Sequence, residues 1–279
     1  MNICRTEEEI SSNQAMQSAC RRLGIESHFI SKEEAKKRAP ILDTSFFKNA
    51  LWEENGGHVD PASATQAFAI AARKLGATIY RQTPVLGTTQ LSDKSWEIQT
   101  HRGNIKTEFV VNAAGLWGRE VGKMAGIELP LLPVEHHYLV TENIPEIEAL
   151  EIELPQINDN ETGSYARQEG MGMLLGAYEK TCIHWAKNGT PKDFGHELLP
   201  DDISRMEWNF EKSVELMPVL GSAGIKRVIN GPMIFSPDLG PLLGPHPSLT
   251  NYFCANGIMN GFNQGAGVGR VISEWIIQG

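Results

Sequence analysis

The order of hydrophobic and polar positions predicts helices near the start of the chain. An apolar position every fourth residue predicts a helix over about 13–23, with Gly24 as its end. Ser31 is a good N-cap for the segment KEEAKKRAP, in which acids come first, bases come last and Pro40 stops the helix. Both signals are local, so they position the two helices without saying what the helices pack against.

Further helices are predicted in the middle and at the end of the chain. Asp60 is a good N-cap and Pro61 suits the first helical position, so a helix is expected to run to about Leu75 and end at Gly76. The segments LWGREVGKMAG and about 201–216 also have helical patterns. A last helix is expected after the glycine-rich stretch GFNQGAGVG.

Strands are predicted where apolar and polar positions alternate with period two. They are expected in NALWEE, in ATIYRQTPVLGTTQL, on both sides of the Arg-Gly-Asn turn of SWEIQTHRGNIKTEFVVNAAG, in PVEHHYLVTE and NYFCAN, and twice in GSYARQEGMGMLLGAYE. The stretch GPMIFSPDLGPLLGPHP is expected to be loop. The result is a mixed α and β chain with long antiparallel stretches and not a regular βαβ array.

Composition and charge narrow the class of protein. A formal net charge of −9 argues against broad nucleic-acid binding, which needs clustered Lys and Arg. The sequence has no run of about 18 apolar residues, so no membrane span is expected. The first residues, MNICRTEEEI, have neither an apolar signal core nor the Arg-rich, acid-poor character of a transit peptide. We therefore expect a cytoplasmic protein, or a mitochondrial-matrix protein if the source is eukaryotic, and not a secreted one.

The cysteines do not predict a metal site. Cys4, Cys20, Cys182 and Cys254 are scattered, without a CxxC pair or His partners at zinc spacing. Unpaired thiols in a reducing compartment are the expected state, and no metal is expected.

Three long segments resemble a known family in order and spacing. They are GGHVDPASATQAFAIAARKLGA, VVNAAGLWGREVGKMAGIELPLLPVEHHYLVT and NGPMIFSPDLGPLLGPHPSLTNYFCANGIMNGFNQGAGVGRVISEWI. The resemblance is to the D-amino-acid-oxidase-type flavoenzymes, and within them to the dimethylglycine and sarcosine dehydrogenases, over about 21–279. It implies an α/β (α+β) FAD/NAD(P)-binding flavoprotein fold with an antiparallel substrate-side sheet. It also implies FAD-dependent oxidative demethylation of an N-methylated glycine, with hydride transfer to flavin N5.

Two departures from the family change that expectation. Family members begin with a strand, a GxGxxG loop and a helix that bind the ADP half of FAD, and this sequence contains no GxGxxG. His28 lies after the region of the His that dimethylglycine dehydrogenases bond to the flavin. The chain is therefore expected to lack the N-terminal ADP-binding βαβ unit. The alternatives are an inactive remnant, a partner-binding module that does not hold FAD on its own, and a gene model whose real start lies upstream.

The resemblance also implies a division of the chain and a set of flavin contacts. The flavin-side segments would be about 58–125 and 228–279, and the substrate-side segments about 20–57 and 130–227. By position in the family motifs, the cofactor-binding residues would be Val85, Ala114, Gly115, Trp117, Gly257, Ile258, Met259, Asn260, Gly261 and Phe262. Gly265, Gly267 and Gly269 are expected to serve close packing of the last helix rather than phosphate binding.

The same comparison of motifs implies three substrate-side residues. His136 matches a family active-site His that would accept a proton from the substrate ammonium or orient the amine. His137 should lie on the opposite face of its strand, so only one of the pair can enter a given pocket. Tyr165 matches the first of a family Tyr pair, whose second position is Ala166 here. Arg167 would clamp a carboxylate or form a structural salt bridge with Glu169 or another acid.

Partners follow from the implied reaction. The expected small-molecule partner is an N-methylated amino acid, and the electron acceptor is oxygen or an electron-transfer protein. The sequence does not determine the oligomeric state.

Overall fold

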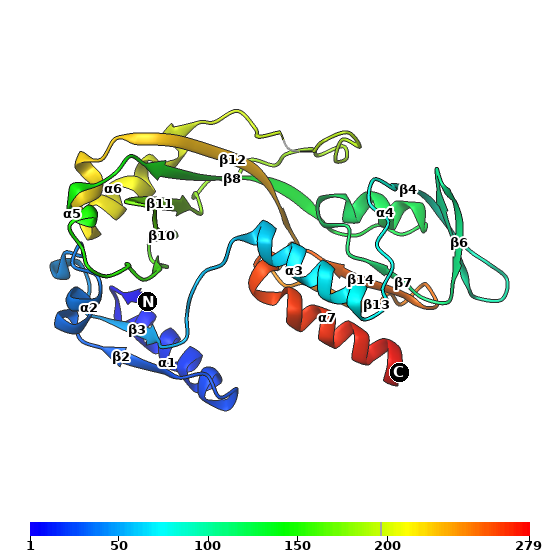
Figure 1. Cartoon of the computed structure of the whole chain (residues 1–279), viewed down its shortest axis with the longest axis horizontal. Helices are drawn as coiled ribbons and strands as arrows, with labels where there is room; N and C mark the ends of the chain where they lie inside the picture. Colours follow the sequence, from blue (N-terminus) through cyan, green and yellow to red (C-terminus); the bar gives the residue numbers. More distant parts are fainter. Residues whose placement is uncertain (196) are drawn as a thin grey trace. The chain divides into compact units, whose positions relative to one another are not determined.

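The structure is a computed structural model that describes residues 1–195 and 197–279, and it divides the chain into two compact units (Figure 1). Unit 1 consists of Met1–His58, His136–Cys182 and Leu198–Gly231. Unit 2 consists of Val59–Glu135, Ile183–Glu197 and Pro232–Gly279. Each unit is assembled from three separate chain segments, so contacts between residues distant in sequence build both.

An eight-stranded sheet is the frame of unit 1, in the order β12-β8-β11-β10-β9-β1-β3-β2. The pairs β8–β11, β11–β10 and β10–β9 are antiparallel, whereas β9 and β1 are parallel. The strands are β1 (Asn2–Cys4), β2 (Ser27–Ile30), β3 (Asn49–Glu53), β8 (Leu132–Thr141), β9 (Ile157–Asp159), β10 (Ser164–Glu169), β11 (Gly172–Ala177) and β12 (Ile225–Phe235). The expected mixture of α and β structure is confirmed.

Local capping signals explain where the helices of unit 1 begin. The Thr6 hydroxyl accepts a hydrogen bond from the Glu9 N–H while the Glu9 side chain accepts one from the Thr6 N–H, which is a capping box. The first helix therefore begins at Glu7, six residues before the predicted start. The cap at Ser31 is confirmed, because its Oγ accepts from the Glu34 N–H. The helices are α1 (Glu7–Arg22), α2 (Lys32–Arg38), α5 (Pro145–Glu148) and α6 (Glu207–Leu216), with 3₁₀ turns η1 (Thr44–Phe46), η3 (Ile203–Met206) and η4 (Pro218–Ser222).

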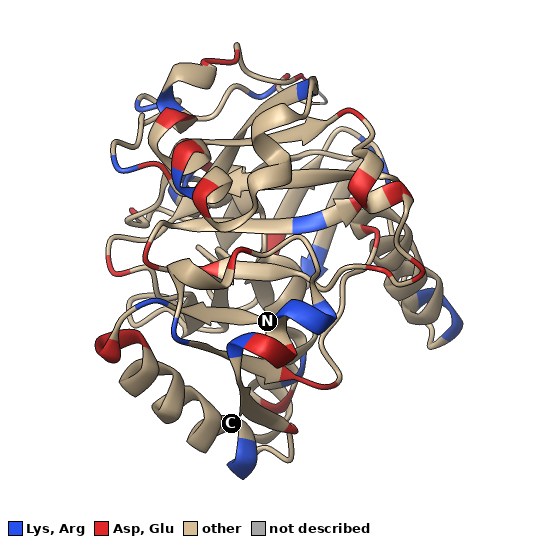
Figure 2. Ribbon diagram, turned by 90° about the vertical axis from the view of Figure 1, so that its left-hand side faces the viewer, with Lys and Arg blue, Asp and Glu red and all other residues tan. Residues whose placement is uncertain are grey.

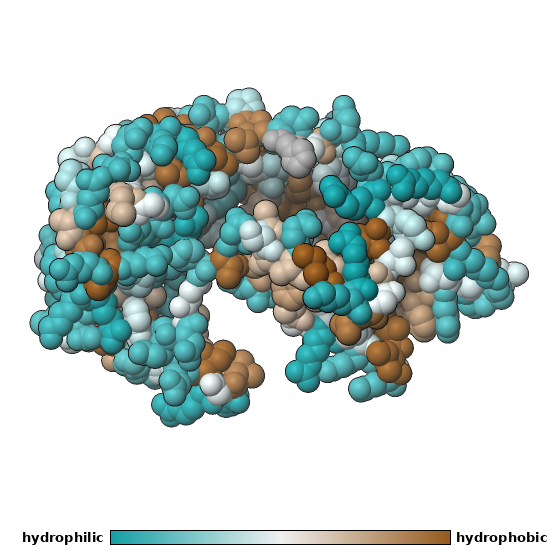
Figure 3. Space-filling view, viewed as in Figure 1, coloured by the Kyte–Doolittle hydropathy of each residue, from teal (hydrophilic) through white to brown (hydrophobic). Residues whose placement is uncertain are grey.

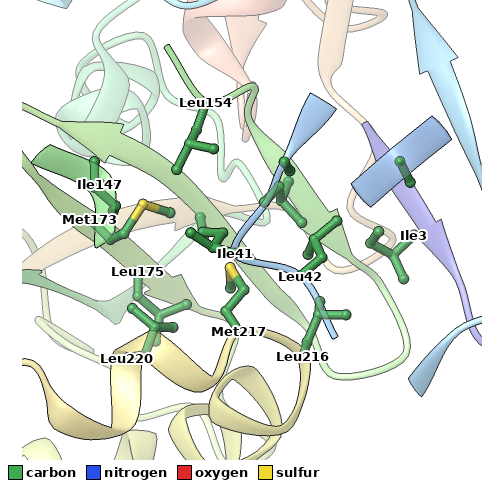
Figure 4. Close-up of a cluster of buried hydrophobic side chains, with 14 of the residues drawn as sticks. Ile3, Ile41, Leu42, Ile147, Leu154, Met173, Leu175, Leu216, Met217 and Leu220 are labelled. Carbon is green, nitrogen blue, oxygen red and sulfur yellow. The ribbon is translucent and has the colours of Figure 1, made fainter. Parts of the chain in front are cut away.

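The hydrophobic core of unit 1 lies against one face of this sheet (Figure 4). Leu139 from β8 and Leu175 from β11 contribute fully buried side chains. Leu42, Met206 and Leu220 are equally buried and come from the segments that pack on the sheet. Burying apolar surface at about 25 cal/mol per Å² makes this cluster the main stabilising element of unit 1.

Unit 2 contains two three-stranded sheets. One is β4 (Val85–Gln90), β5 (Trp96–Thr100) and β6 (Gly103–Thr107), and the other has the order β13-β14-β7, with β13 (Leu242–Pro245), β14 (Tyr252–Asn256) and β7 (Val110–Asn112). Trp96 and Tyr252 are fully buried and centre a second core cluster, with ring centroids 5.4 Å apart. The helices are α3 (Pro61–Lys74), α4 (Gly118–Met124) and α7 (Gly261–Gln278), with the 3₁₀ turn η2 (Gly115–Trp117).

Two helices of unit 2 leave apolar side chains on its surface. The predicted cap of α3 is confirmed, since Asp60 Oδ1 accepts from the Ser63 N–H at 2.7 Å, yet no residue of α3 is buried. Phe68 on α3 is 61% exposed, and α7 buries Ile272 alone. Hydrophobic surface over these two helices is visible in Figure 3. Capping thus determined the start of α3, whereas packing within this chain contributes little to it.

The sequence-based expectations about strands differ from the structure in several places. The segment GPMIFSPDLGPLLGPHP was expected to be loop, but its first part belongs to the 11-residue strand β12, and Leu242–Pro245 form β13. Pro232 is tolerated there because β12 is at the edge of its sheet, where one row of backbone N–H groups needs no partner strand. The short strands β1, β2 and β9 were not predicted. Residues 77–84 were expected to be strand and are not, since Gln82 has a positive φ of 51°.

The charged residues lie largely on helices and connecting segments, with both signs interspersed (Figure 2). Of the helices described, none is both long enough and apolar enough to cross a bilayer. Within residues 1–195 and 197–279, no group of three or more His, Cys, Asp or Glu side chains is placed to hold a metal ion.

Candidate active site

The two adjacent histidines of β8 point to opposite faces of the sheet, as predicted. His137 is fully buried; its Nδ1 lies 2.5 Å from Glu179 Oε1, and its Nε2 accepts a hydrogen bond from the Asp202 N–H at 3.2 Å. An Nε2 that accepts leaves the ring proton on Nδ1, facing the carboxylate. His136 lies on the other face. Of the two, His136 is therefore the one available to a substrate.

An aromatic cluster of three rings surrounds His136 on this face. Tyr165 OH lies 3.1 Å from His136 Nε2, although the two residues are separated by a whole strand. The Tyr178 ring centroid is 4.8 Å from that of His136 and 5.9 Å from that of Tyr165. In the β8–β11 register, His137 pairs with Ala177, so His136 faces Tyr178 just beyond the strand end. The cluster therefore comes from three neighbouring strands.

Burial keeps both hydrogen-bonded partners of this cluster uncharged. It lowers the pKa of His136 to about 4, with a smaller contribution from neighbouring His137. Burial and the nearby Tyr178 and Tyr138 raise the pKa of Tyr165 well above its ordinary value. At neutral pH the site thus holds a neutral imidazole and a protonated phenol, which can exchange donor and acceptor roles as the imidazole changes tautomer.

The lowered pKa of His136 predicts a pH dependence of stability. In the unfolded chain this His binds a proton near its ordinary pKa of 6.5, whereas in the folded chain its pKa is about 4. Stability is therefore lost as the pH falls through this window. His136→Gln has no titrating group at this position and should not lose this stability. Between pH 7 and 4, the free energy of unfolding of the variant should therefore fall by about 2–3 kcal/mol less than that of the wild type.

Urea unfolding at several pH values between 7 and 4 measures this difference. His101→Gln is the matched control, because His101 is exposed on unit 2 and should leave the wild-type pH profile unchanged. Parallel profiles for His136→Gln and the wild type would show that His136 is not held neutral by the fold.

Arg167 lies on the same face as Tyr165, two residues along β10. Its Nη1 is 2.5 Å from Glu169 Oε2 and donates to the Gln168 carbonyl at 3.1 Å. Arg167, Glu169 and Met171 line an open pocket of about 420 Å³ at the β10–β11 turn. Of the two interpretations of Arg167, the structure shows the salt bridge; the role as a carboxylate clamp stays a prediction.

The residues expected to face the flavin lie in unit 2. Val85 begins β4, next to an irregularity in the β4–β5 register. Ala114 and Gly115 form the turn after β7, where Gly115 has a positive φ of 54° and a side chain placed on it would meet no described atom within 4 Å. Trp117 ends the following 3₁₀ turn, and its Nε1 donates to the Pro191 carbonyl at 2.9 Å.

The second group of expected flavin contacts forms the turn between β14 and α7. Gly257 has a φ of 65° and packs closely on Leu131 and Ser236, which holds the start of this turn in place. Ile258, Met259 and Asn260 follow, and Gly261 and Phe262 already belong to α7, whose first turn has no side-chain cap. The structure therefore places uncapped backbone N–H groups at the start of an 18-residue helix.

The interpretation of Gly265, Gly267 and Gly269 was wrong in two respects. The last helix was expected to begin after these glycines, but they lie inside α7. They were also expected to serve close packing, yet a side chain on any of them would meet no atom of the described chain within 4 Å. A run of glycines signals a loop in sequence, and here the helix continues through it despite their low propensity.

Two buried asparagines support the turn that is expected to face the flavin, and they were not singled out from sequence. Asn112 Nδ2 donates to the Gly118 carbonyl at 2.9 Å, and its Oδ1 accepts from the Ala114 N–H at 3.2 Å. Asn256 Nδ2 reaches the same Oδ1 at 3.3 Å from the end of β14. This pair links the ends of two parallel strands to the turn. An Asn that ends a buried strand is the signal that could have found them.

Comparison with known proteins shows the family of this chain. The sequence profile of the DAO family, described as FAD dependent oxidoreductase, matches residues 1–275. The chain belongs to this family of FAD-dependent oxidoreductases. It is 40% identical to mouse mitochondrial dimethylglycine dehydrogenase over 259 residues, which are 91% of this chain and 30% of that protein. It is 31% identical to human mitochondrial sarcosine dehydrogenase over 99% of this chain and 30% of that protein.

Solved structures give the same family assignment. The L-proline dehydrogenase of P. horikoshii superposes with a TM-score of 0.83 at 27% identity, covering 99% of this chain and 71% of that one. The chain spans 30% of the length of the curated relatives named above. For this chain, the activity of those whole proteins is therefore only proposed.

The family implies FAD, and the residues of unit 2 fit such a group. A flavin needs backbone donors and room for a flat ring close to the main chain. Gly115 and Gly261 both leave open space where a side chain would stand, and the first turn of α7 presents N–H groups without a side-chain cap. These positions coincide with those that the sequence motifs imply.

The sequence motifs missed one member of the aromatic cluster. Tyr178 lies just after β11 and is 41% exposed, with its ring against those of His136 and Tyr165. The family Tyr pair has Ala166 at its second position, and Ala166 is buried on the core face. The tyrosine in GAYE is visible in sequence, but only the β8–β11 register shows that it faces His136.

Proposed function

We propose that this chain takes part in FAD-dependent oxidative demethylation of an N-methylated amino acid of the dimethylglycine or sarcosine type. Unit 1 would supply the substrate-contacting side chains, and unit 2 would supply flavin-binding backbone. When bound, FAD supplies the two-electron acceptor for hydride from the N-methyl carbon. The observation that carries this proposal is the His136–Tyr165–Tyr178 cluster in a chain 40% identical to a dimethylglycine dehydrogenase.

The cluster suits an N-methylated amine for two reasons. Aromatic rings pack well against the methyl groups of a neutral N-methylated amine. A neutral His136 adds no positive charge beside the amine, which must be uncharged for its lone pair to assist hydride loss. With a pKa of about 4, His136 is too weak a base to deprotonate an ammonium fully, so we assign it the task of orienting the neutral amine.

The proposed roles of the other residues follow from their contacts. Tyr165 would hold the His136 ring and tautomer through the 3.1 Å hydrogen bond. Arg167, although paired with Glu169, would attract the substrate carboxylate with its remaining positive potential. In unit 2, the uncapped first turn of α7 would stabilise negative charge on the reduced cofactor. The mitochondrial relatives favour the mitochondrial matrix over the cytoplasm as the location.

Reconstitution of the purified chain with FAD tests the proposal. We expect a bound-flavin spectrum that dimethylglycine or sarcosine bleaches without oxygen, and His136→Ala should slow bleaching by about tenfold or more. Reoxidation by air or by an added electron-transfer protein then identifies the class of acceptor.

The outcomes separate the alternatives. No flavin after reconstitution would show that this chain is not an enzyme by itself, which favours the partner-binding or remnant alternative. Bound flavin that neither amine bleaches would overturn the substrate class. Unchanged bleaching in His136→Ala would remove His136 from the reaction.

A further inference from the structure

Gly176 occupies an unusual position in the middle of β11. It pairs with Tyr165 on one neighbouring strand and with Tyr138 on the other. Directly opposed residues in a sheet point to the same face, so a tyrosine flanks Gly176 on each side. Gly176 itself has no side chain to fill the position, and it is buried.

The space above Gly176 is filled by the Tyr165 ring. A Cβ built on Gly176 would lie 1.9 Å from Tyr165 Cζ and 2.3 Å from both its Cε1 and its hydroxyl oxygen. Such distances are far below van der Waals contact, so the ring lies directly across the glycine backbone. The φ of Gly176 is not in the left-handed region, and an alanine backbone could adopt it. The glycine is therefore required for space and not for conformation.

The Tyr165 side chain crosses over β11 to reach His136. Tyr165 is on β10 and His136 is on β8, with β11 between them. Neighbouring strands are about 4.8 Å apart, so the backbones of β10 and β8 are about 10 Å apart in the plane of the sheet. The Tyr165 and His136 side chains together must bridge this distance over β11. Only a ring that lies flat over the middle strand brings its hydroxyl to 3.1 Å from Nε2.

We propose that Gly176 is a positioning residue of the active site, which allows Tyr165 to lie across β11 and hydrogen-bond to His136. Any side chain at 176 lifts the Tyr165 ring off the sheet and separates its hydroxyl from Nε2. The ring is then free to turn toward solvent, and the His136 tautomer loses the partner that selects it. The consequence for amine oxidation rests on the proposed function, whereas the geometric claim does not.

The first test needs neither FAD nor substrate. In Gly176→Ala, the ¹⁵N signals of the His136 ring should shift as in Tyr165→Phe, because both changes remove the same hydrogen bond. Gly231→Ala is the matched control, since a side chain at this glycine on β12 meets no described atom within 4 Å. It should leave the His136 signals unchanged. Unchanged signals in Gly176→Ala would overturn the proposal.

A double variant separates this steric effect from a general weakening of the strand. Gly176→Ala should lower the urea midpoint of the wild type but not that of Tyr165→Ala, where the colliding ring is absent. If Gly176→Ala alone does not fold, folding of the double variant supports the proposal, and failure of both overturns it. Equal loss of stability in both backgrounds also overturns it.

With flavin-loaded protein, Gly176→Ala and Tyr165→Phe should slow bleaching by similar factors, and their combination should slow it no further. A protein that binds no flavin would contradict the proposed function while leaving the NMR and unfolding tests decisive for Gly176. Additive losses in the double variant would show that Gly176 acts on something other than the Tyr165 hydroxyl.

Discussion

Asp159→Ala is expected to lower the free energy of unfolding of this chain by about 3–5 kcal/mol, measured by urea denaturation at pH 7. Asp159 is the last residue of β9, and its side chain is 4% exposed. It binds Arg5, which follows β1 and is 12% exposed. Removing the carboxylate leaves the Arg5 guanidinium buried without its counter-charge, which is the most costly kind of single substitution.

The geometry of this pair explains the size of the expected effect. Arg5 Nε donates to Asp159 Oδ1 and Oδ2 at 3.1 and 3.0 Å, and Nη2 donates to Oδ2 at 2.6 Å. Such a forked, charge-assisted contact is stronger than a single hydrogen bond. Within the part of the chain that the structure describes, the guanidinium also donates from Nη2 to the Lys212 carbonyl at 3.4 Å, which is too weak to compensate.

Two comparisons show whether the loss comes from an uncompensated buried charge. Glu7→Ala breaks the exposed Lys48–Glu7 pair and should cost less than about 1 kcal/mol. Arg5→Met combined with Asp159→Leu removes both charges and should recover more than half of the stability that Asp159→Ala loses. If the double variant is as unstable as Asp159→Ala, the stabilising element is the specific hydrogen-bond geometry and not the balance of charge.

This ion pair could not be predicted from the sequence, because 154 residues separate its members. Signals confined to a single turn were more informative. The caps at Ser31 and Asp60 were predicted and are present. The capping box at Thr6 has the same kind of signature, but the weak apolar face further along hid it, so the first helix was predicted to start too late.

Two of the strands that were missed, β1 and β12, lack local signals for a physical reason. β1 is only three residues long, and the acids that begin a helix follow after two residues. Its strand conformation comes from pairing with β3 and β9, which lie far away in sequence. β12 contains Gly231 and Pro232, which normally indicate a loop, and only its place at a sheet edge makes them acceptable.

The candidate site also contains some features that the sequence predicted and others that it did not. Alternation along one strand predicted that His136 and His137 face opposite sides, and the structure confirms it. The motifs named Tyr165, but its contact with His136 depends on the register of three strands and on the absence of a side chain at Gly176. Such cross-strand geometry has no signature within a single segment.

The second large expected effect concerns the core face of β11. Leu175 is fully buried next to Gly176 on β11, and its side chain lies in the core cluster (Figure 4). Successive residues of a strand point to opposite faces, so Leu175 points away from the aromatic cluster. Leu175→Ala should lower the free energy of unfolding by about 2–4 kcal/mol, through lost transfer energy and the cavity that remains. Urea denaturation with the wild-type protein at the same pH measures the loss.

The neighbours of Leu175 decide where in this range the loss falls. Met173, Met206 and Met217 belong to the same cluster, and their flexible side chains can move partly into the cavity. We therefore expect a value in the lower half of the range. Leu23→Ala is the control, because Leu23 is 76% exposed and its truncation should change stability by less than about 0.5 kcal/mol.

The same variant also tests whether the two faces of β11 are independent. Because Leu175 contacts the core and Gly176 contacts Tyr165, the ¹⁵N signals of the His136 ring should stay unchanged in Leu175→Ala while stability falls. A shift of these signals equal to that of Tyr165→Phe would mean that core packing also holds the tyrosine over the glycine. Packing on the core face of β11 would then affect the position of Tyr165 on the other face, and the role of Gly176 would depend on the core beneath it.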